Sequence, residues 1–223
     1  VMSPEPTTLG GVVEAFRRHL GGPRPLMSLP SWCLNIGVRL GDLAARLGWA
    51  PPVRSTALAE LRRGVSGDPM PWSTATGIQP ARLGMALSRR PSTVQDHWFV
   101  RLYLLNPLTI VVLALFWTVS GLIALFPAFD QATAILTDHG FSRPLAVAVT
   151  VASSLIDIFI GIAIALRCTC RPGLWLGIAV SLFYMAGAAV ITPDMWIEPL
   201  GALVKTGPAI ILMLIALVTL DDR

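Results

Sequence analysis

An aspartate in the middle of a long apolar run is the residue of this sequence with the strongest claim to a chemical role. Asp157 is the one charged residue between Leu145 and Leu166. A carboxylate near the centre of a bilayer costs roughly 2.5–3.5 kcal/mol on insertion scales, so by default it marks a binding or proton-transfer site. Small or polar side chains recur beside it at helical spacing and predict one stripe that faces a bundle interior. These neighbours are Thr150, Ser153, Ser154 and Gly161.

Two interpretations of this stripe stay open: hydrogen-bonded packing between helices, and a ligand or proton site. The next apolar run carries Ser181 and Tyr184 about 8 and 11 residues from its inner end, near the depth of Asp157. We therefore predict that Asp157 bonds to Tyr184 or Ser181, directly or through one water. The predicted intramembrane polar cluster comprises Thr150, Ser153, Ser154, Asp157, Ser181 and Tyr184.

A second charged group is expected at the outer rim of the membrane. Lys205 lies about 4 residues below the outer end of the last apolar run, and Asp157 about 12 residues below the outer end of its own. The resulting axial gap of about 12 Å is too long for an ion pair, so Lys205 should extend toward the surface. The predicted outer-rim charge cluster comprises Asp194, Glu198 and Lys205.

The remaining reactive residues show no functional pattern. Cys168 and Cys170 form a lone Cys-x-Cys, which is weak support for a redox pair in a reducing compartment. The three histidines are scattered without metal-ligand spacing, and no haem, flavin, iron–sulfur or dinucleotide motif is present. We therefore predict no metal, assign no catalytic residue, and find no cofactor motif. A quinone is the one small ligand considered, because Tyr184 could donate to its carbonyl.

The elements that must position these residues are four apolar segments, which short polar breaks divide. They cover residues 108–126, 145–166, 174–192 and 203–220. Each is about as long as a membrane-spanning helix, which needs roughly 17–25 residues, and lipid offers an open backbone no hydrogen-bond partners. The chain is 54% hydrophobic and 13% charged, against about 25% charged in soluble proteins. The predicted fold class is all-α: an integral membrane four-helix bundle preceded by a small helical cytoplasmic segment.

Residues 1–92 form the predicted cytoplasmic segment, and residues 93–223 form the membrane domain. Thr7-Thr8 and Ser55 are expected to cap two short helices, two more should begin near Ser31 and Pro80, and residues 64–80 are expected to be loop. Such helices bury little core, so this piece should depend on the membrane half or on a partner. Residues 1–104 hold 12 arginines and 6 acidic residues, which favours anionic lipid headgroups as neighbours. No nucleic-acid-binding motif accompanies these arginines, so no nucleic-acid partner is expected.

The distribution of arginines orients the bundle through the positive-inside rule. Just before the first span the chain carries Arg89, Arg90 and Arg101. The turn between the second and third spans is flanked by Arg167 and Arg171. The other two connections hold a single arginine, Arg143, among acidic residues. We therefore expect a multi-pass protein of a bacterial-type cytoplasmic (inner) membrane. Both termini and the Arg167–Arg171 turn are predicted in the cytoplasm.

Two stretches of the membrane half carry a family resemblance. One is Trp117 with Ser120-Gly121-Leu122, and the other is Glu198-Pro199-Leu200-Gly201-Ala202-Leu203-Val204-Lys205. Over residues 100–220 the sequence resembles the DoxX-like family of small four-helix membrane proteins. The resemblance implies an association with quinone-linked sulfur oxidation and with redox complexes.

A further stretch, Trp49-Ala50-Pro51-Pro52-Val53-Arg54-Ser55-Thr56 with Gly67-Asp68-Pro69, resembles the tail of certain bacterial fusion proteins. In those proteins a short-chain-dehydrogenase-like nucleotide-binding domain precedes a DoxX-like domain. This sequence departs from them because it lacks a glycine-rich dinucleotide fingerprint. Neither Tyr103 nor Tyr184 is followed four residues later by lysine. Dehydrogenase activity is therefore not carried over to this chain.

Two classes of function follow. The first is an accessory subunit or membrane anchor of a quinone-linked or redox complex, which binds an apolar ligand or a partner protein. The alternative is a membrane-bound oxidoreductase of the fusion type, whose nucleotide-binding part is absent here. The missing cofactor motifs favour the first class. A small transporter is disfavoured, because the sequence shows no internal repeats or broken helices.

Overall fold

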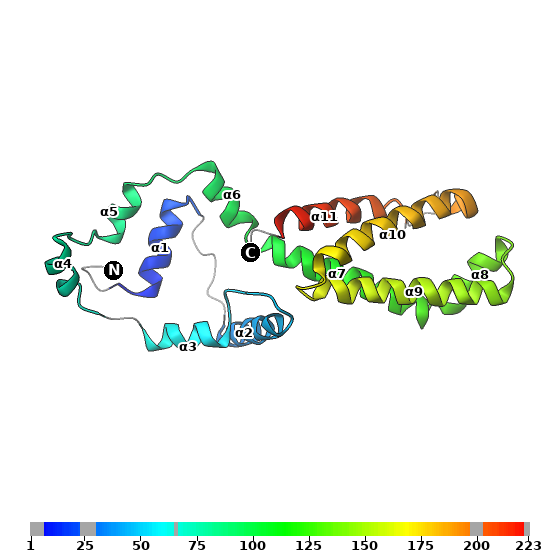
Figure 1. The fold of residues 1–223 in the computed structure, drawn as a ribbon, viewed down its shortest axis with the longest axis horizontal. Coiled ribbons are helices and arrows are strands. Elements are labelled where there is room, and N and C mark those ends of the chain that lie inside the picture. Colours follow the sequence, from blue (N-terminus) through cyan, green and yellow to red (C-terminus); the bar gives the residue numbers. More distant parts are fainter. Residues whose placement is uncertain (1–6, 23–29, 65–66, 197–202, 221–223) are drawn as a thin grey trace. The chain divides into compact units, whose positions relative to one another are not determined.

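The computed structural model describes residues 7–22, 30–64, 67–196 and 203–220, without the side chains at 194 and 195. Within these residues the chain is helical and contains no strand, as predicted (Figure 1). It divides into two compact units, which are described separately. One contains residues 1–43 and 51–103, and the other contains residues 44–50 and 104–223.

Four apolar helices build the second unit, which we call the membrane unit. They are α7 (Leu105–Leu125), α9 (Arg143–Ala165), α10 (Cys170–Ile191) and α11 (Thr206–Thr219). A shorter helix, α8 (Phe129–Asp138), connects α7 to α9, and a 3₁₀ turn, η1 (Pro193–Trp196), follows α10. The connection predicted between the first two spans as a polar break is therefore largely helical.

Three helical stretches in the described part of the chain are long and apolar enough to cross a membrane. They are Val94–Leu125, Arg143–Ala165 and Cys170–Ile191, and they contain most of the first three predicted segments. The fourth helix, α11, has 14 residues and is thus about 21 Å long, shorter than a hydrocarbon core of about 30 Å. It begins at Thr206 rather than at residue 203. The structure therefore supports three spans and a shorter fourth apolar helix.

The outward faces of these helices are themselves apolar. Phe183 on α10 is 72% exposed and Val218 on α11 is 78% exposed. Large apolar surfaces of this kind are unfavourable in water by about 25 cal/mol per Å², and monomeric soluble proteins rarely expose them over wide patches. The apolar exterior and the three long helices together indicate a multi-pass membrane protein.

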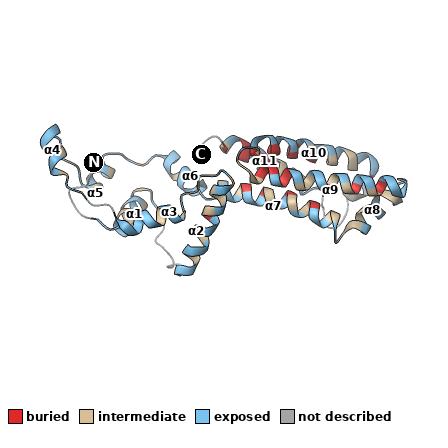
Figure 2. Ribbon diagram, turned by 60° about the horizontal axis from the view of Figure 1, so that its bottom comes forward, coloured by how far each residue is buried: buried red, intermediate tan, exposed pale blue. Residues whose placement is uncertain are grey.

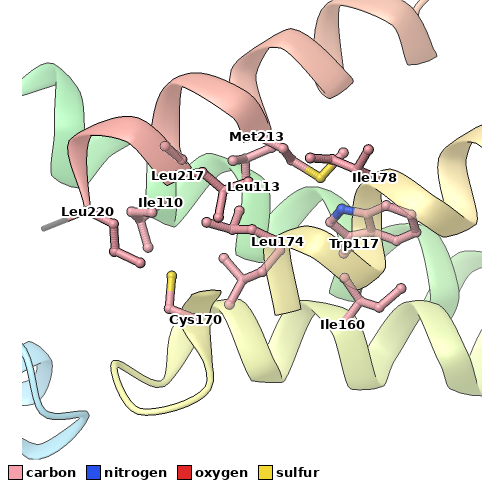
Figure 3. Close-up of a cluster of buried hydrophobic side chains, with 12 residues drawn as sticks. Ile110, Leu113, Trp117, Ile160, Cys170, Leu174, Ile178, Met213, Leu217 and Leu220 are labelled. Carbon is pink, nitrogen blue, oxygen red and sulfur yellow. The ribbon is translucent and has the colours of Figure 1, made fainter. Parts of the chain in front are cut away.

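One hydrophobic core joins all four helices of the bundle. Figure 3 shows side chains from each helix meeting around Leu113, Leu174 and Met213, and Figure 2 shows buried residues gathered on these helices. Its buried members are Ile110, Leu113, Trp117, Ile160, Ile164, Cys170, Leu174, Ile178, Met213, Ala216, Leu217 and Leu220. The short α11 is thus an integral part of the bundle.

Two glycines bring α7 and α9 into direct backbone contact. A Cβ on Gly121 of α7 would lie 2.5 Å from the carbonyl oxygen of Ser154. Conversely, a Cβ on Gly161 of α9 would lie 2.1 Å from Thr118 Oγ1 and 2.8 Å from the carbonyl oxygen of Ala114. In lipid the hydrophobic effect does not drive helices together. Van der Waals packing at close approach holds them in contact instead. These contacts fix the faces that α9 turns toward α7.

The first unit consists of short helices with little core. They are α1 (Leu9–His19), most of α2 (Ser31–Arg46), α3 (Ser55–Arg63), α4 (Met70–Thr76), α5 (Leu83–Ser88) and α6 (Val94–Leu102). Thr8 caps α1 by accepting from the Gly11 N–H, and Thr93 with Asp96 forms a capping box on α6. Among the described residues of this unit, Val38, Gly41 and Ser73 are the buried ones.

The sequence interpretation of this unit is wrong in two places. Helix α4 lies inside the segment 64–80 that was expected to be loop, because Pro69 and Met70 start a helical turn that Gly77 ends. Ser55 was expected to cap α3 but is its first residue. Its N–H and hydroxyl both donate to Asp42 Oδ1 at 3.1 Å, so the cap comes from α2.

Candidate functional site

The middle of the α9–α10 contact holds a carboxyl–phenol pair. Tyr184 on α10 donates a hydrogen bond to Asp157 Oδ1 on α9 at 3.0 Å, and its hydroxyl also lies 3.5 Å from the carbonyl oxygen of Ser153. Both side chains are half-buried. Of the two partners predicted for Asp157, the structure shows Tyr184, which confirms that contact.

Helical geometry explains why this contact could be predicted. Gly173 of α10 faces Ala163 and Ile164 of α9, and the two helices run antiparallel after a tight turn. From that contact Tyr184 lies eleven residues, about 16 Å, further along α10, whereas Asp157 lies six to seven residues, about 10 Å, back along α9. A helical side chain points back toward the N-terminus of its helix, so the long phenol of Tyr184 extends toward the depth of Asp157. The tight turn therefore sets the register of the pair.

The polar stripe of α9 faces inward, as expected. Thr150 and Ser154 are buried, and Gly161 packs against α7. The hydroxyls of Ser153 and Ser154 both donate to the carbonyl oxygen of Thr150, at 3.1 and 2.7 Å. These two serines are thus satisfied within their own helix, as is common for hydroxyl side chains in spans.

The hydroxyl of Thr150 differs from those of its neighbours. Its Oγ1 is buried and has no hydrogen-bond partner among the described residues. A buried polar group without a partner costs about 1–3 kcal/mol, so such a group in a native fold calls for a physical reason. On α10, Ser181 is also buried. The structure therefore places polar groups of both α9 and α10 inside the bundle.

The arrangement can bind a polar head but shows no ion pair. Among the described residues, no salt bridge includes Asp157, so this carboxyl has a phenol rather than a cation beside it. Together, Asp157, Tyr184 and Thr150 offer hydroxyl donors and carboxyl oxygens within an apolar surrounding. Such a set suits the carbonyl or hydroxyl of a lipophilic ligand, or the transfer of a proton.

The outer-rim charge cluster is not brought together by the described residues. Lys205 is exposed in the turn before α11. The side chain of Asp194 and all of Glu198 lie outside the described residues. The cluster therefore stays a prediction.

The cysteines and histidines form no centre in the described part of the chain. Cys168 is exposed, whereas Cys170 is fully buried within the bundle core, and both are free thiols. Where the structure describes the chain, no group of three His, Cys, Asp or Glu residues could hold a metal. Burial in the core gives Cys170 a packing role.

A contact that the sequence did not reveal holds residues 44–50 to the bundle. Trp49 Nε1 donates to the carbonyl oxygen of Ala165 at 2.8 Å, and the Arg167 N–H donates to the carbonyl oxygen of Leu47 at 3.0 Å. The Arg167 guanidinium lies over the Trp49 ring, 5.4 Å from its centroid. Its Nη2 also donates to the carbonyl oxygen of Leu220. A contact between residues so distant in the chain leaves no local sequence pattern.

Comparison with known proteins identifies the bundle. Residues 114–214, which run from within α7 to within α11, match the DoxX-like family. No curated protein and no solved structure matched the chain. The match covers both Asp157 and Tyr184, so the polar pair lies inside the family region. The membrane part of this chain, over residues 114–214, belongs to the DoxX-like family.

Proposed function

We propose that this protein is a membrane-embedded accessory subunit or anchor of a redox complex, and that it binds a quinone-class ligand at its intramembrane polar cluster. The observation that carries the proposal is the Tyr184–Asp157 hydrogen bond between α9 and α10. The buried, unpartnered hydroxyl of Thr150 in the same stripe adds to it. An accessory role agrees with the lack of a cofactor motif in the sequence, and a quinone would supply the redox chemistry when bound.

The chemistry of the residues fits a quinone head. A quinone carbonyl accepts a hydrogen bond, and the Thr150 hydroxyl is a donor whose partner is missing from the described residues. Asp157 and Tyr184 can hold or release a proton at the carboxyl oxygen or the phenol. The outward faces of α9 and α10 expose apolar side chains such as Phe159 and Phe183, and these suit an isoprenoid tail.

The anchoring part of the proposal rests on the contact around Trp49. It ties the segment that follows α2 to the turn between α9 and α10. We also propose that residues 1–92 form a helical cytoplasmic segment attached to the membrane domain at 93–223, where a partner protein of the complex would bind. Both termini and the Arg167–Arg171 turn would then face the cytoplasm.

The molecules that co-purify with the protein test whether it binds a quinone. The protein would be purified from native membranes in mild detergent, and its lipophilic molecules would be extracted and identified by mass spectrometry. We expect a quinone in the wild type and several-fold less in Thr150→Val and Tyr184→Phe.

Thr109→Val is the matched control, because Thr109 lies on α7 and its hydroxyl bonds within its own helix to the Leu105 carbonyl oxygen. It should retain the quinone at the wild-type level. Phospholipid alone in every sample, or equal quinone in all variants, would contradict a site at the polar cluster.

A further inference from the structure

Helix α2 exposes a continuous apolar stripe. Trp32, Ile36, Leu40 and Leu43 are each about half exposed or more. Their spacing of four, four and three residues places them on one face of the helix. An exposed stripe of this length, rimmed by polar residues, is typical of a surface that contacts lipid or protein.

The opposite face of α2 is covered by its own unit, which fixes the direction of the stripe. Val38 and Gly41 are buried, and a Cβ on Gly41 would lie 1.8 Å from the carbonyl oxygen of Val53. Asp42 accepts hydrogen bonds from the N–H and hydroxyl of Ser55. These contacts hold α2 against the start of α3, so the stripe cannot turn inward without breaking them.

Arginines border the stripe on one side. At 100° per residue, Arg39 and Arg46 lie next to the apolar face, and both are exposed. Their long side chains can lay apolar stems along a lipid boundary while the guanidinium groups reach phosphate oxygens. An apolar face bordered by arginine is complementary in charge to anionic headgroups.

The chain at the end of α2 contacts the turn between α9 and α10. Its last turn and the residues up to Ala50 belong to the membrane unit, where Leu47 and Trp49 bond to Arg167 and Ala165. The turn at 166–169 joins two consecutive spanning helices, so it must lie where the chain leaves the hydrocarbon. The chain just after α2 therefore has a fixed place at the lipid boundary.

We propose that α2 is an interfacial helix, which lies in the plane of the membrane with Trp32, Ile36, Leu40 and Leu43 in lipid. Arg39 and Arg46 bind the phosphates of anionic lipids beside it. Helices of this kind bury their apolar face about 5–10 Å into the boundary between headgroups and acyl chains. The inference goes beyond the proposed function and stands without it, because it requires no ligand in the bundle.

Spin labels on the full chain test the proposal. A nitroxide would be attached at Ile36→Cys or at Leu34→Cys in a Cys33→Ser, Cys168→Ser background, with the protein in phosphatidylglycerol nanodiscs. Leu34 is a matched control, since it is 44% exposed against 48% for Ile36 but lies on another face of α2. Collisions with oxygen, which concentrates in lipid, and with a neutral nickel chelate, which stays in water, would be measured for each label.

We expect the logarithm of the oxygen-to-nickel collision ratio to be positive at position 36 and negative at position 34. Arg39→Gln with Arg46→Gln should lower the ratio at position 36, and neutral phosphatidylcholine should do the same. Arg62→Gln with Arg63→Gln on α3 should not. Equal nickel access at both positions overturns the proposal, and shielding of position 36 from both reagents shows a protein rather than lipid against α2, which also overturns it.

Discussion

Tyr184 and Asp157 pair across two helices that the chain joins by a turn of only a few residues. The phenol donates to Oδ1 of the carboxyl at 3.0 Å, and each residue lies about two-thirds of the way along its own helix. Each group would otherwise need a partner in a surrounding that offers few. The bond therefore ties α10 to α9 at a point remote from their connecting turn.

Removing either partner of this bond should destabilise the bundle in a coupled way. We expect a coupling free energy of about 0.6 kcal/mol, and at most about 1.7 kcal/mol, as measured for hydrogen bonds between spans. The measurement is a double-mutant cycle of Asp157→Asn and Tyr184→Phe on unfolding in detergent. A cycle of Asp157→Asn with Lys205→Met is the comparison and should show no coupling. Coupling to Lys205 without coupling to Tyr184 would contradict the arrangement.

The contact between α7 and α9 should tolerate no side chain at its glycines. Gly121→Ala and Gly161→Ala each place a Cβ within 2.5 Å of an atom of the facing helix. Overpacking of this kind costs about 1–3 kcal/mol, and thermal unfolding in detergent should show it as a lower midpoint. Gly187→Ala on α10 is the control, because its Cβ would meet nothing within 4 Å. Alanine favours a helix over glycine, so this control should not lose stability. An equal loss at Gly187 would contradict packing between α7 and α9 as the cause.

The features that the sequence predicted are those that depend on helical spacing. The long apolar runs predict α7, α9 and α10, and equal depth in two antiparallel helices predicts the Tyr184–Asp157 bond. Helix α8 and helix α4 are missed because short connecting helices carry weak local signals. The bond of Trp49 to Ala165 joins residues 116 positions apart, and no periodic pattern encodes such a contact. The sequence also could not predict that the buried Thr150 hydroxyl lacks a partner, because this depends on the packing of other helices.

Chemical labelling of Cys168 tests the orientation of the bundle in the membrane. Cys168 is exposed and Cys170 is fully buried, so Cys168 should be the residue of the α9–α10 turn that reacts with a maleimide. With both termini and this turn in the cytoplasm, a membrane-impermeant maleimide added to intact cells should leave Cys168 unlabelled, in a Cys33→Ser background. Asp138→Cys, at the exposed end of α8, should react. Labelling of Cys168 from outside would reverse the orientation.

The helical segment before the bundle should not fold alone. Its described residues include few buried side chains, with Val38 and Ser73 among them, and a chain of fewer than about 90 residues with so little core is marginal. Residues 1–88 expressed alone should show partial helical circular dichroism and a gradual, non-cooperative melt. A cooperative transition would show an independent domain instead.

The contact at Trp49 makes part of this chain a closed ring. Residues 44–50 are fastened to the bundle, and the chain rejoins the same unit at residue 104. The stretch 51–103 between these two points thus has both ends fixed, which lowers the conformational entropy it can gain when its helices open. A protease that cuts once in this stretch, for example between α4 and α5, opens the ring without releasing either piece. The nicked protein would run as two fragments on a denaturing gel and elute as one particle from a sizing column.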